Sequence, residues 1–500
     1  MNTPFSTTQN EVTTDLPTKQ ACPFPGHPNT PLETKATTQR GAKNSPSPQK
    51  PVRKVTKHGT LSMTADAFVK GFGREDGLIA RLKGHEFSRF RTAFRNYVGI
   101  EHPDDIEHVL VKNRDNFNKG PDYEPLTGVL GLGLFTDDGK SWSRHRELLN
   151  PVFHKKYLNG LIDKMIDPIQ EERDRMDRLP DNQPVEMVQL MTDMTLEVVG
   201  NSLFSQSFKG YLGEDASKTI TKGLRLGMYL SRVFLLVDPP KWMSDTAWAI
   251  MHSNVKLPPP LGQFQSIQHR FNNFVDAVIN DRIENPVENP DVLNLMLSAS
   301  DDQGKLTPAR IRAEGITLML AGHETTANGL CWFWYLLAKN PEARGRMLEE
   351  IDTVLQGRTP TLEDLPKLQW TMACFDEALR IYPPVWMITR QALEDDIIGG
   401  NKVKAGTTVL IPICNIHHNP RWWPEPEKFD PSRFLPGADK RPSFSYIAFG
   451  GGRRICIGRS FSLMEVGLII AMLSQRYVFD MDPGEVVEAE TTFTLVQKND

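Results

Sequence analysis

One cysteine lies in a setting that could make it a metal ligand. The run Phe449–Gly458 reads FGGGRRICIG, so three glycines and two arginines precede Cys456. Glycine adopts positive φ angles at little cost and lets the backbone approach a flat ligand closely. An apolar helical pattern begins just after the cysteine, which places its sulfur at a helix N-terminus, where the macrodipole and free N–H groups favour a thiolate. A structural cysteine buried beside a glycine turn is the alternative.

Polar residues also interrupt the most apolar helical pattern of the chain. A helix is predicted from Thr307–Pro308 to about Lys339, and it is apolar on nearly every face, so it must lie inside the protein. Within it stands the run from Ala321 to Thr326, AGHETT. Threonine hydroxyls can bond to carbonyls one turn earlier and distort the helix, and a buried carboxylate needs a hydrogen-bond donor. We predict a polar, water-accessible notch here, with a small polar core cluster as the alternative.

Two pairs of residues share a helix face by their spacing. Glu377 and Arg380 are three apart, and Trp142 and Arg146 are four apart, on predicted helices. Taken alone, such pairs usually lie on a solvated surface.

Two other groups contain metal-binding residue types without being favoured as metal sites. Cys22 and His27 fall in a polar segment, and the pair His417 and His418 is interpreted as surface residues of a turn.

The elements that must position these residues are mainly helical up to about Tyr382. Beyond residue 385, short apolar runs such as Thr407–Ile413 alternate with proline- and glycine-rich turns, which is typical of small sheets. The fold class predicted is therefore mainly α with small β-sheets. Besides the long helix, the patterns predict helices over Asp104–Lys112, Asp138–Leu149, Leu161–Arg178 and Phe264–Glu284.

Composition limits the class of protein further. The chain has 500 residues with a net charge of −4, so no strongly basic surface suggests nucleic acid as a partner. No run of about 18–20 apolar residues predicts a membrane span. Five cysteines without paired spacing favour a reducing, cytoplasmic location. Residues 1–58 have few aliphatic side chains and are predicted to form a disordered tail before a globular domain over residues 59–500.

Together these residues resemble the signature motifs of the cytochrome P450 family. The cysteine loop matches Phe-x-x-Gly-x-Arg-x-Cys-x-Gly at all fixed positions, and the notch matches the oxygen-binding motif Ala/Gly-Gly-x-Glu/Asp-Thr-Thr. The Trp-x-x-x-Arg pair, the Glu-x-x-Arg pair and the segment Pro426–Phe434 match three further motifs in the family's order. The resemblance covers about residues 60–500. It implies the P450 fold, with haem between the long central helix and the helix after the cysteine loop.

The resemblance also implies a role for each matching residue. Cys456 would be the axial ligand of haem b (iron protoporphyrin IX), and its thiolate would favour O–O cleavage. Thr325 would hydrogen-bond the bound dioxygen, and Glu324 would relay protons to it. The cofactor-binding residues implied are Trp142, Arg146, Arg390, Phe449, Arg454 and Gly458. Arg433 would join Glu377 and Arg380 in a buried structural network. The substrate-pocket residues implied are Leu130, Ala321, Val385, Trp386 and Met387.

The function implied is that of a monooxygenase that inserts one atom of O2 into a hydrophobic substrate such as a fatty acid, terpenoid, steroid or alkyl-aromatic compound. No flavin or nicotinamide module is recognised within the 500 residues, so a separate ferredoxin or flavoprotein reductase would supply electrons. We expect a monomer. A peroxide-driven haem-thiolate enzyme and a non-catalytic haem protein that binds a ligand are the alternatives.

The C-terminal end of the sequence departs from the family's pattern. P450 chains commonly continue into a hairpin whose tip touches the substrate, whereas this sequence stops at Asp500. Either the chain is truncated, which leaves a fused reductase open, or its hairpin is minimal.

Overall fold

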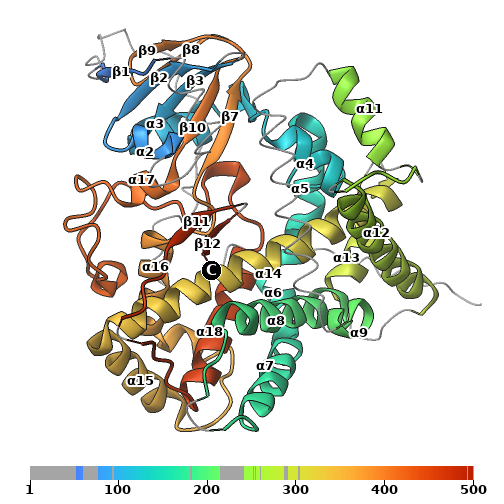
Figure 1. The fold of residues 1–500 in the computed structure, drawn as a ribbon, viewed down its shortest axis with the longest axis vertical. Coiled ribbons are helices and arrows are strands. Elements are labelled where there is room, and N and C mark those ends of the chain that lie inside the picture. The colour runs from blue at the N-terminus through green and yellow to red at the C-terminus, as the bar shows by residue number, and fades with distance from the viewer. Residues whose placement is uncertain are drawn as a thin grey trace, which may run out of the picture.

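The computed structural model describes residues 52–59, 77–92, 95–180, 183–213, 241–251, 253, 255–259, 261–285, 291–301, 304–482, 484–492 and 494–498. Within these ranges the chain is mainly helical, with one six-stranded sheet and three two-stranded sheets. Figure 1 shows the larger sheet at one end of the molecule, while helices make up most of the rest. The fold class predicted from the sequence, mainly α with small sheets, is confirmed. Cys22 and His27 lie outside the described residues.

The long apolar helix is α14 (Pro308–Lys339), and it runs through the middle of the molecule (Figure 1). It begins where the sequence predicts, because the Thr307 side chain accepts a hydrogen bond from the N–H of Arg310 and Pro308 occupies the first turn. It packs against α8 (Met187–Val199) and α16 (Gln369–Ile381). This central position buries nearly all of its faces, as its composition requires.

The other predicted helices are present with small changes at their ends. They are α5 (Gly139–Leu149), α7 (Ile162–Met176), which contains Pro168, and α12 (Leu261–Glu284). The helix expected over Asp104–Lys112 is α3 (Pro103–Glu107) followed directly by a π-helical turn, His108–Lys112. No helix in the described ranges has both the length and the hydropathy needed to cross a membrane.

The six-stranded sheet places two basic residues side by side. Its strand order is β1 (Val55–Lys57), β2 (Phe87–Arg91), β3 (Asn96–Ile100), β10 (Thr408–Ile411), β7 (Ile388–Ala392) and β4 (Phe117–Lys119). Antiparallel pairing of β4 with β7 sets Lys119 opposite Arg390. Neighbouring strands bring such partners within reach of one ligand, so this register bears on the functional site.

The prediction that residues 1–58 form a disordered tail is wrong for Val55–Lys57. These residues form β1, where Val55 pairs in parallel with Phe87 of β2. Just before it, the backbone carbonyl of Arg53 accepts a hydrogen bond of 3.0 Å from the Asn401 side chain. The sheet edge supplies backbone partners that an isolated polar segment lacks. Residues 1–51 lie outside the described part of the chain.

The prediction that His417 and His418 are surface residues is also wrong, since both are buried. His417 ends the short helix α17 (Ile413–His417), and its Nε2 accepts the backbone N–H of Ile447 at 3.0 Å. The Nδ1 of His418 lies 2.8 Å from the carbonyl of Cys414. Burial lowers the pKa of His417 to about 3, so its ring is neutral. Each ring has a backbone partner, which allows it to be buried.

A C-terminal hairpin is present, formed by β11 (Ala489–Thr491) and β12 (Leu495–Gln497). It lies against the middle of α14, as Figure 1 shows. The indole of Trp332 on α14 donates to the carbonyl of Leu495 at 3.1 Å, and the N–H of Leu495 donates to the carbonyl of Pro384 at 2.9 Å. The sequence alone did not decide whether such a hairpin is present. The structure shows a short one, which is hydrogen-bonded to the long helix.

Candidate active site

The loop before Cys456 is closed tightly by its backbone. The N–H of Cys456 donates to the carbonyl of Phe449 at 2.9 Å. Gly452 has a φ of +67°, and a β-carbon there would lie 2.1 Å from the carbonyl oxygen of Leu110. Only glycine fits such a position. After this loop Gly458 precedes α18 (Arg459–Ser474), so the sulfur lies near a helix N-terminus, as the sequence predicts.

Cys456 is exposed, yet it is enclosed deeply enough that burial raises the pKa of its thiol. The backbone N–H of Gly458 and the guanidinium of Arg146 oppose that rise in pKa without cancelling it. The helix N-terminus therefore favours the thiolate as predicted, but burial outweighs it, and a bound metal ion is what would remove the proton. A side chain that is both accessible and enclosed is suited to bind a ligand.

The notch in α14 carries the predicted back-bonded threonines. The hydroxyl of Thr325 donates to the carbonyl of Ala321 at 2.8 Å, and that of Thr326 donates to the carbonyl of Gly322 at 3.0 Å. The helix nevertheless continues through the notch as an unbroken α-helix, so the predicted distortion does not interrupt it. Ala321 is exposed, although it lies in the middle of a largely buried helix. The notch therefore borders accessible space.

Glu324 in this notch contacts the C-terminal hairpin, which the sequence did not predict. Its Oε1 accepts a hydrogen bond of 2.8 Å from the hydroxyl of Thr494, and the same hydroxyl accepts one of 2.9 Å from the side-chain amide of Asn328. Asn328 follows Glu324 by one helical turn, so its position was readable from the sequence. Thr494 was not, because it lies 170 residues away along the chain.

Three cationic side chains lie near one another: Lys119, Arg390 and Arg454. Burial lowers the pKa of Lys119 to about 7, and the guanidinium groups of Arg454 and Arg390 lower it further, while Asp138 opposes. Asp138 forms an ion pair with Arg454. The Nη1 atom of Arg454 is buried without a hydrogen-bond partner. Crowded cations with an unused donor fit an anionic ligand. Sequence reasoning missed Lys119, although its place opposite Arg390 in the sheet explains it.

Trp142 and Arg146 of α5 lie in different surroundings. Trp142 is buried beneath Arg454, whose guanidinium carbon is 4.3 Å from the ring centroid, and its indole N–H donates to the carbonyl of Leu134 at 3.1 Å. Burial lowers the pKa of the Arg146 guanidinium, and its electrostatic interaction with Cys456 opposes that change. The structure thus brings Trp142 against Arg454 and places Arg146 within electrostatic range of the thiol.

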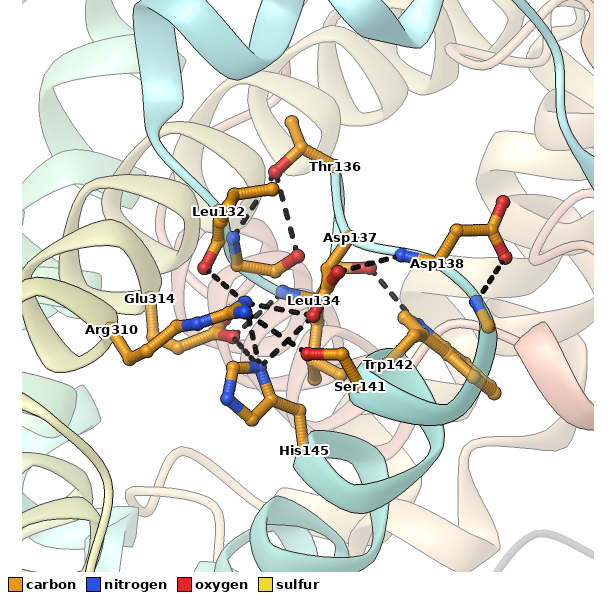
Figure 2. Close-up of polar contacts among 12 residues, drawn as sticks. Leu132, Leu134, Thr136, Asp137, Asp138, Ser141, Trp142, His145, Arg310 and Glu314 are labelled. Carbon is orange, nitrogen blue, oxygen red and sulfur yellow. Dashed lines mark hydrogen bonds and ion pairs between the residues drawn. The ribbon is translucent and has the colours of Figure 1, made fainter.

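The loop that positions Trp142 is fixed by a buried glutamate of α14 (Figure 2). Glu314 is buried, and its Oε1 accepts the N–H of Leu134 at 2.6 Å. The His145 ring lies 3.8 Å from that oxygen, and Arg310 pairs with Asp137 at 2.7 Å. Burial raises the pKa of Glu314 to about 7. One residue, Leu134, therefore joins α14 to the indole of α5, through its N–H and its carbonyl.

Glu377, Arg380 and Arg433 form one buried network. The Nε of Arg380 lies 2.7 Å from the Glu377 carboxylate, and the Nε of Arg433 lies 3.4 Å from it. The backbone N–H of Asp430 also donates to Glu377 at 2.9 Å. Burial raises the pKa of Glu377, and the hydrogen bond and charge of Arg380 oppose the rise. Paired in this way, the charges can be buried.

The five residues expected in the pocket differ in exposure. Leu130 and Trp386 are buried, Met387 is partly buried, and Val385 and Ala321 are exposed. The indole of Trp386 donates to the carbonyl of Thr492 at 3.3 Å, so this residue joins the hairpin to the segment after α16. The proposed lining is thus apolar, apart from that indole N–H.

These features define a class of site. An enclosed, accessible thiol, a nearby set of cations with an unused donor, and a polar notch in an apolar helix fit an iron porphyrin, whose metal takes a thiolate and whose carboxylates take cations. The geometry is that of a haem-thiolate protein.

Comparison with known proteins places the chain in a family. A family model described as cytochrome P450 matches residues 81–500. The chain is 46% identical over 464 residues to a putative cytochrome P450 132 of Mycobacterium tuberculosis. The matched region covers 93% of this chain and 97% of that protein. It is 31% identical to cyclooctatin synthase of Streptomyces melanosporofaciens (79% and 83% covered) and 31% identical to cytochrome P450 4A12B of Mus musculus (84% and 84% covered). The chain belongs to the cytochrome P450 family, and it is a P450 monooxygenase with a haem-thiolate cofactor.

Proposed function

We propose that this monooxygenase inserts oxygen into a C–H or C=C bond of a hydrophobic molecule, a fatty acid, terpenoid, steroid or alkyl-aromatic compound, using electrons from a separate protein. One oxygen atom enters the substrate and the other leaves as water, which consumes a pair of electrons and a pair of protons. When bound, the haem supplies the redox chemistry, and the chain supplies its ligand, its orientation and the protons.

We assign the cofactor contacts as follows. Cys456 would hold the haem iron through its sulfur, and Phe449 and Gly458 shape the loop that presents it. The propionates are held by Arg454, Arg390 and Lys119, with Trp142 stacked beneath Arg454. The buried Nη1 of Arg454 and the lowered pKa of Lys119 support this assignment, because a carboxylate would satisfy the first and reverse the second. Arg146 interacts electrostatically with Cys456, so we assign it to the thiolate side, and we also propose that it contacts a propionate.

The observation that carries the proposed chemistry is the notch of α14. Ala321 is accessible, Thr325 lies one turn beyond it, and Glu324 is hydrogen-bonded rather than isolated. We assign Thr325 to orient the oxygen that is being reduced and Glu324 to deliver protons to it. Relatives that use peroxide directly tend to lack such an acid and alcohol pair, so the pair favours an enzyme that reduces O2.

The substrate class is inferred from the apolar pocket residues. Leu130, Val385, Trp386 and Met387 offer hydrocarbon and aromatic surface without charge. Ala321, with only a methyl group, leaves room beside the notch. A largely hydrophobic molecule fits this lining best.

We place the electron donor on the face near Cys456. Arg144 and Arg453 are partly exposed basic residues of that region; Arg144 donates to the carbonyl of Gly304 at 2.9 Å and Arg453 pairs with Glu147 at 3.2 Å. A basic face would steer an acidic ferredoxin or flavoprotein. The pair Arg144→Glu and Arg453→Glu should slow electron transfer and weaken its dependence on salt. Unchanged rates and salt dependence would remove this assignment.

The free cysteines and the net charge of the chain support proposals about its location and partners. The four described cysteines are all free, which supports the proposal of a reducing, cytoplasmic location. The near balance of charge gives no sign of a nucleic-acid partner.

The deciding experiment combines spectra with product analysis on the haem-loaded protein. We expect the long-wavelength Soret band of a thiolate ligand in the reduced, CO-bound state, and spin shifts with some members of a panel of lipids and terpenoids. A surrogate ferredoxin and its reductase should then give NADPH-dependent product from those members. Greater turnover with hydrogen peroxide alone would favour the peroxide-driven alternative, and no coupled turnover across the panel would favour a ligand-binding protein.

A further inference from the structure

A threonine of the C-terminal hairpin, Thr494, is hydrogen-bonded to Glu324 in the notch of α14. Thr494 is fully buried, and its Oγ1 lies 2.8 Å from Glu324 Oε1 and 2.9 Å from Asn328 Nδ2. Asn328 is itself buried. The three side chains thus form a short hydrogen-bonded chain that runs along α14 and through the hairpin.

The direction of donation in this chain follows from the groups themselves. An amide NH2 can only donate, an ionised carboxylate can only accept, and a hydroxyl has a single hydrogen. Because Asn328 donates to the hydroxyl of Thr494, the hydrogen of that hydroxyl points at Glu324. The bond from Asn328 is buried and the bond to Glu324 is partly buried, which strengthens both, so the carboxylate has one preferred orientation as long as the hydroxyl stays in place.

The position of Thr494 is set by bonds that do not involve Glu324. The carbonyl of Thr494 accepts both the backbone N–H and the side-chain hydroxyl of Thr492, each at 2.9 Å. The next residue, Leu495, is held by the backbone of Pro384 and by the indole of Trp332. Thr494 is therefore held in place by contacts that do not involve Glu324.

We infer that Thr494 is a positioning residue for proton delivery, which holds the Glu324 carboxylate in one orientation and is itself oriented by Asn328. The inference rests on the proposed role of Glu324. A proton donor is effective only at hydrogen-bonding distance from its acceptor, and a shift of about 1 Å can cost about a hundredfold in rate. The same turn accepts the indole of Trp386, so the hairpin also joins a proposed pocket residue to the proton-delivering side chain.

A purely structural role would produce a different pattern of effects. If the bonds only fasten the hairpin to α14, their loss lowers the melting temperature and leaves the fate of the reduced oxygen unchanged. If Thr494 orients the acid, its loss changes how electrons divide between product and hydrogen peroxide, and it changes the solvent isotope effect on kcat, with little change in KM.

The test compares Thr494→Val, Thr494→Ser and Glu324→Gln in the haem-loaded enzyme with a surrogate redox chain. Thr494→Val removes the hydroxyl at nearly constant volume. We expect product per NADPH to fall about tenfold or less, a fraction of the full effect of a general acid, with peroxide rising to match. Thr494→Ser keeps the hydroxyl and should restore the parent value. The reduced CO spectrum should stay that of the thiolate form in all three.

Thr492→Val is the matched control, because it removes the side-chain bond to the Thr494 carbonyl, keeps the backbone N–H bond to the same carbonyl, and leaves the Thr494 hydroxyl in place. It should leave product per NADPH unchanged. If it matches Thr494→Val, loosening of the turn explains the effect and the inference is wrong.

If Thr494→Val behaves as the parent while Glu324→Gln diverts electrons to peroxide, Thr494 does not position the acid, although Glu324 keeps its role. If Glu324→Gln has no effect, the proposed role of Glu324 itself fails. Should Thr494→Val not retain haem, Asn328→Ala approaches the same chain from its other end and should give a smaller shift of the same sign.

Discussion

Gly322 of α14 lies directly against Val199 of α8. A β-carbon built on Gly322 would be 2.9 Å from the Cγ2 of Val199, closer than side-chain carbons approach in folded proteins. Glycine has a low helix propensity, so Gly322 costs helix stability. Its missing side chain, however, lets α14 and α8 pack closely beside the notch. Close packing here places the Thr195 hydroxyl 3.1 Å from the carbonyl of His323, which ties α8 to the notch.

The first prediction concerns Gly322→Ala. Overpacking should lower the free energy of unfolding by about 1–3 kcal/mol, despite the better helix propensity of alanine. Thermal or denaturant unfolding measures the change. Gly345→Ala in α15 (Pro341–Leu355) is the matched control, since no atom lies within 4 Å of its added β-carbon, and it should be neutral or slightly stabilising. Equal effects of the two changes would contradict close packing at Gly322.

The second prediction concerns pH and Glu314. Its pKa is raised from 4.5 to about 7 by burial; Lys119 and Arg310 limit the rise, Asp137 adds to it, and the His145 ring lies alongside. The folded protein therefore binds a proton more tightly than the unfolded chain does. This group's contribution to stability is fully present below about pH 4.5 and declines as the pH rises through about 7, by about 3 kcal/mol at most.

Glu314→Gln should flatten that decline, because the amide keeps an oxygen for the N–H of Leu134 but does not titrate. Melting temperatures of the haem-loaded protein from about pH 5 to about pH 8 would show it. Glu350→Gln is the control: its carboxylate accepts the N–H groups of Trp370 and Thr371, both at 2.8 Å, and it lies outside this cluster. A parent protein and a Glu314→Gln variant with parallel pH profiles would refute the prediction.

The third prediction concerns the buried network. Glu377→Gln leaves Arg380 fully buried without its anion and should cost about 3–5 kcal/mol of unfolding free energy. Unfolding followed by circular dichroism measures the loss. Lys404→Met breaks an exposed ion pair with Asp395 and should not shift the transition measurably. A small effect of Glu377→Gln would contradict the prediction, because it would mean that Arg380 reaches water once its anion is removed.

The fourth prediction concerns Lys119. Replacing it by methionine removes one of the three cations assigned to the propionates, so haem should leave faster. The rate of haem transfer to an excess of apomyoglobin measures this without any assay of activity, and we expect an increase of about tenfold, the equivalent of about 1.4 kcal/mol. Lys112→Met removes a lysine that pairs with Glu107 on the surface and is the control. Identical transfer rates would place the propionates elsewhere.

Local sequence predicted the parts of this site that lie within one element. The cysteine loop, the notch and the Glu377–Arg380 pair each depend on residues a few positions apart, so their motifs and spacing were sufficient. Lys119 and Thr494 were missed because their relevance arises from strand register and from a hairpin that folds back over α14. The burial of His417 was also missed, since its partner Ile447 lies 30 residues away. Contacts of that separation leave no periodic pattern in a sequence.

The hairpin that carries Thr494 has a consequence for the order in which the enzyme is made. Synthesis proceeds at about 5–20 residues per second, so Thr494 follows Cys456, 38 positions earlier, by a few seconds. The cysteine loop and α14 can thus be complete while Glu324 still lacks its partner. A nascent chain that acquires haem in this interval would have its metal ligand before its proton-handling groups are arranged, so the ability to bind haem would precede the ability to use oxygen without releasing peroxide.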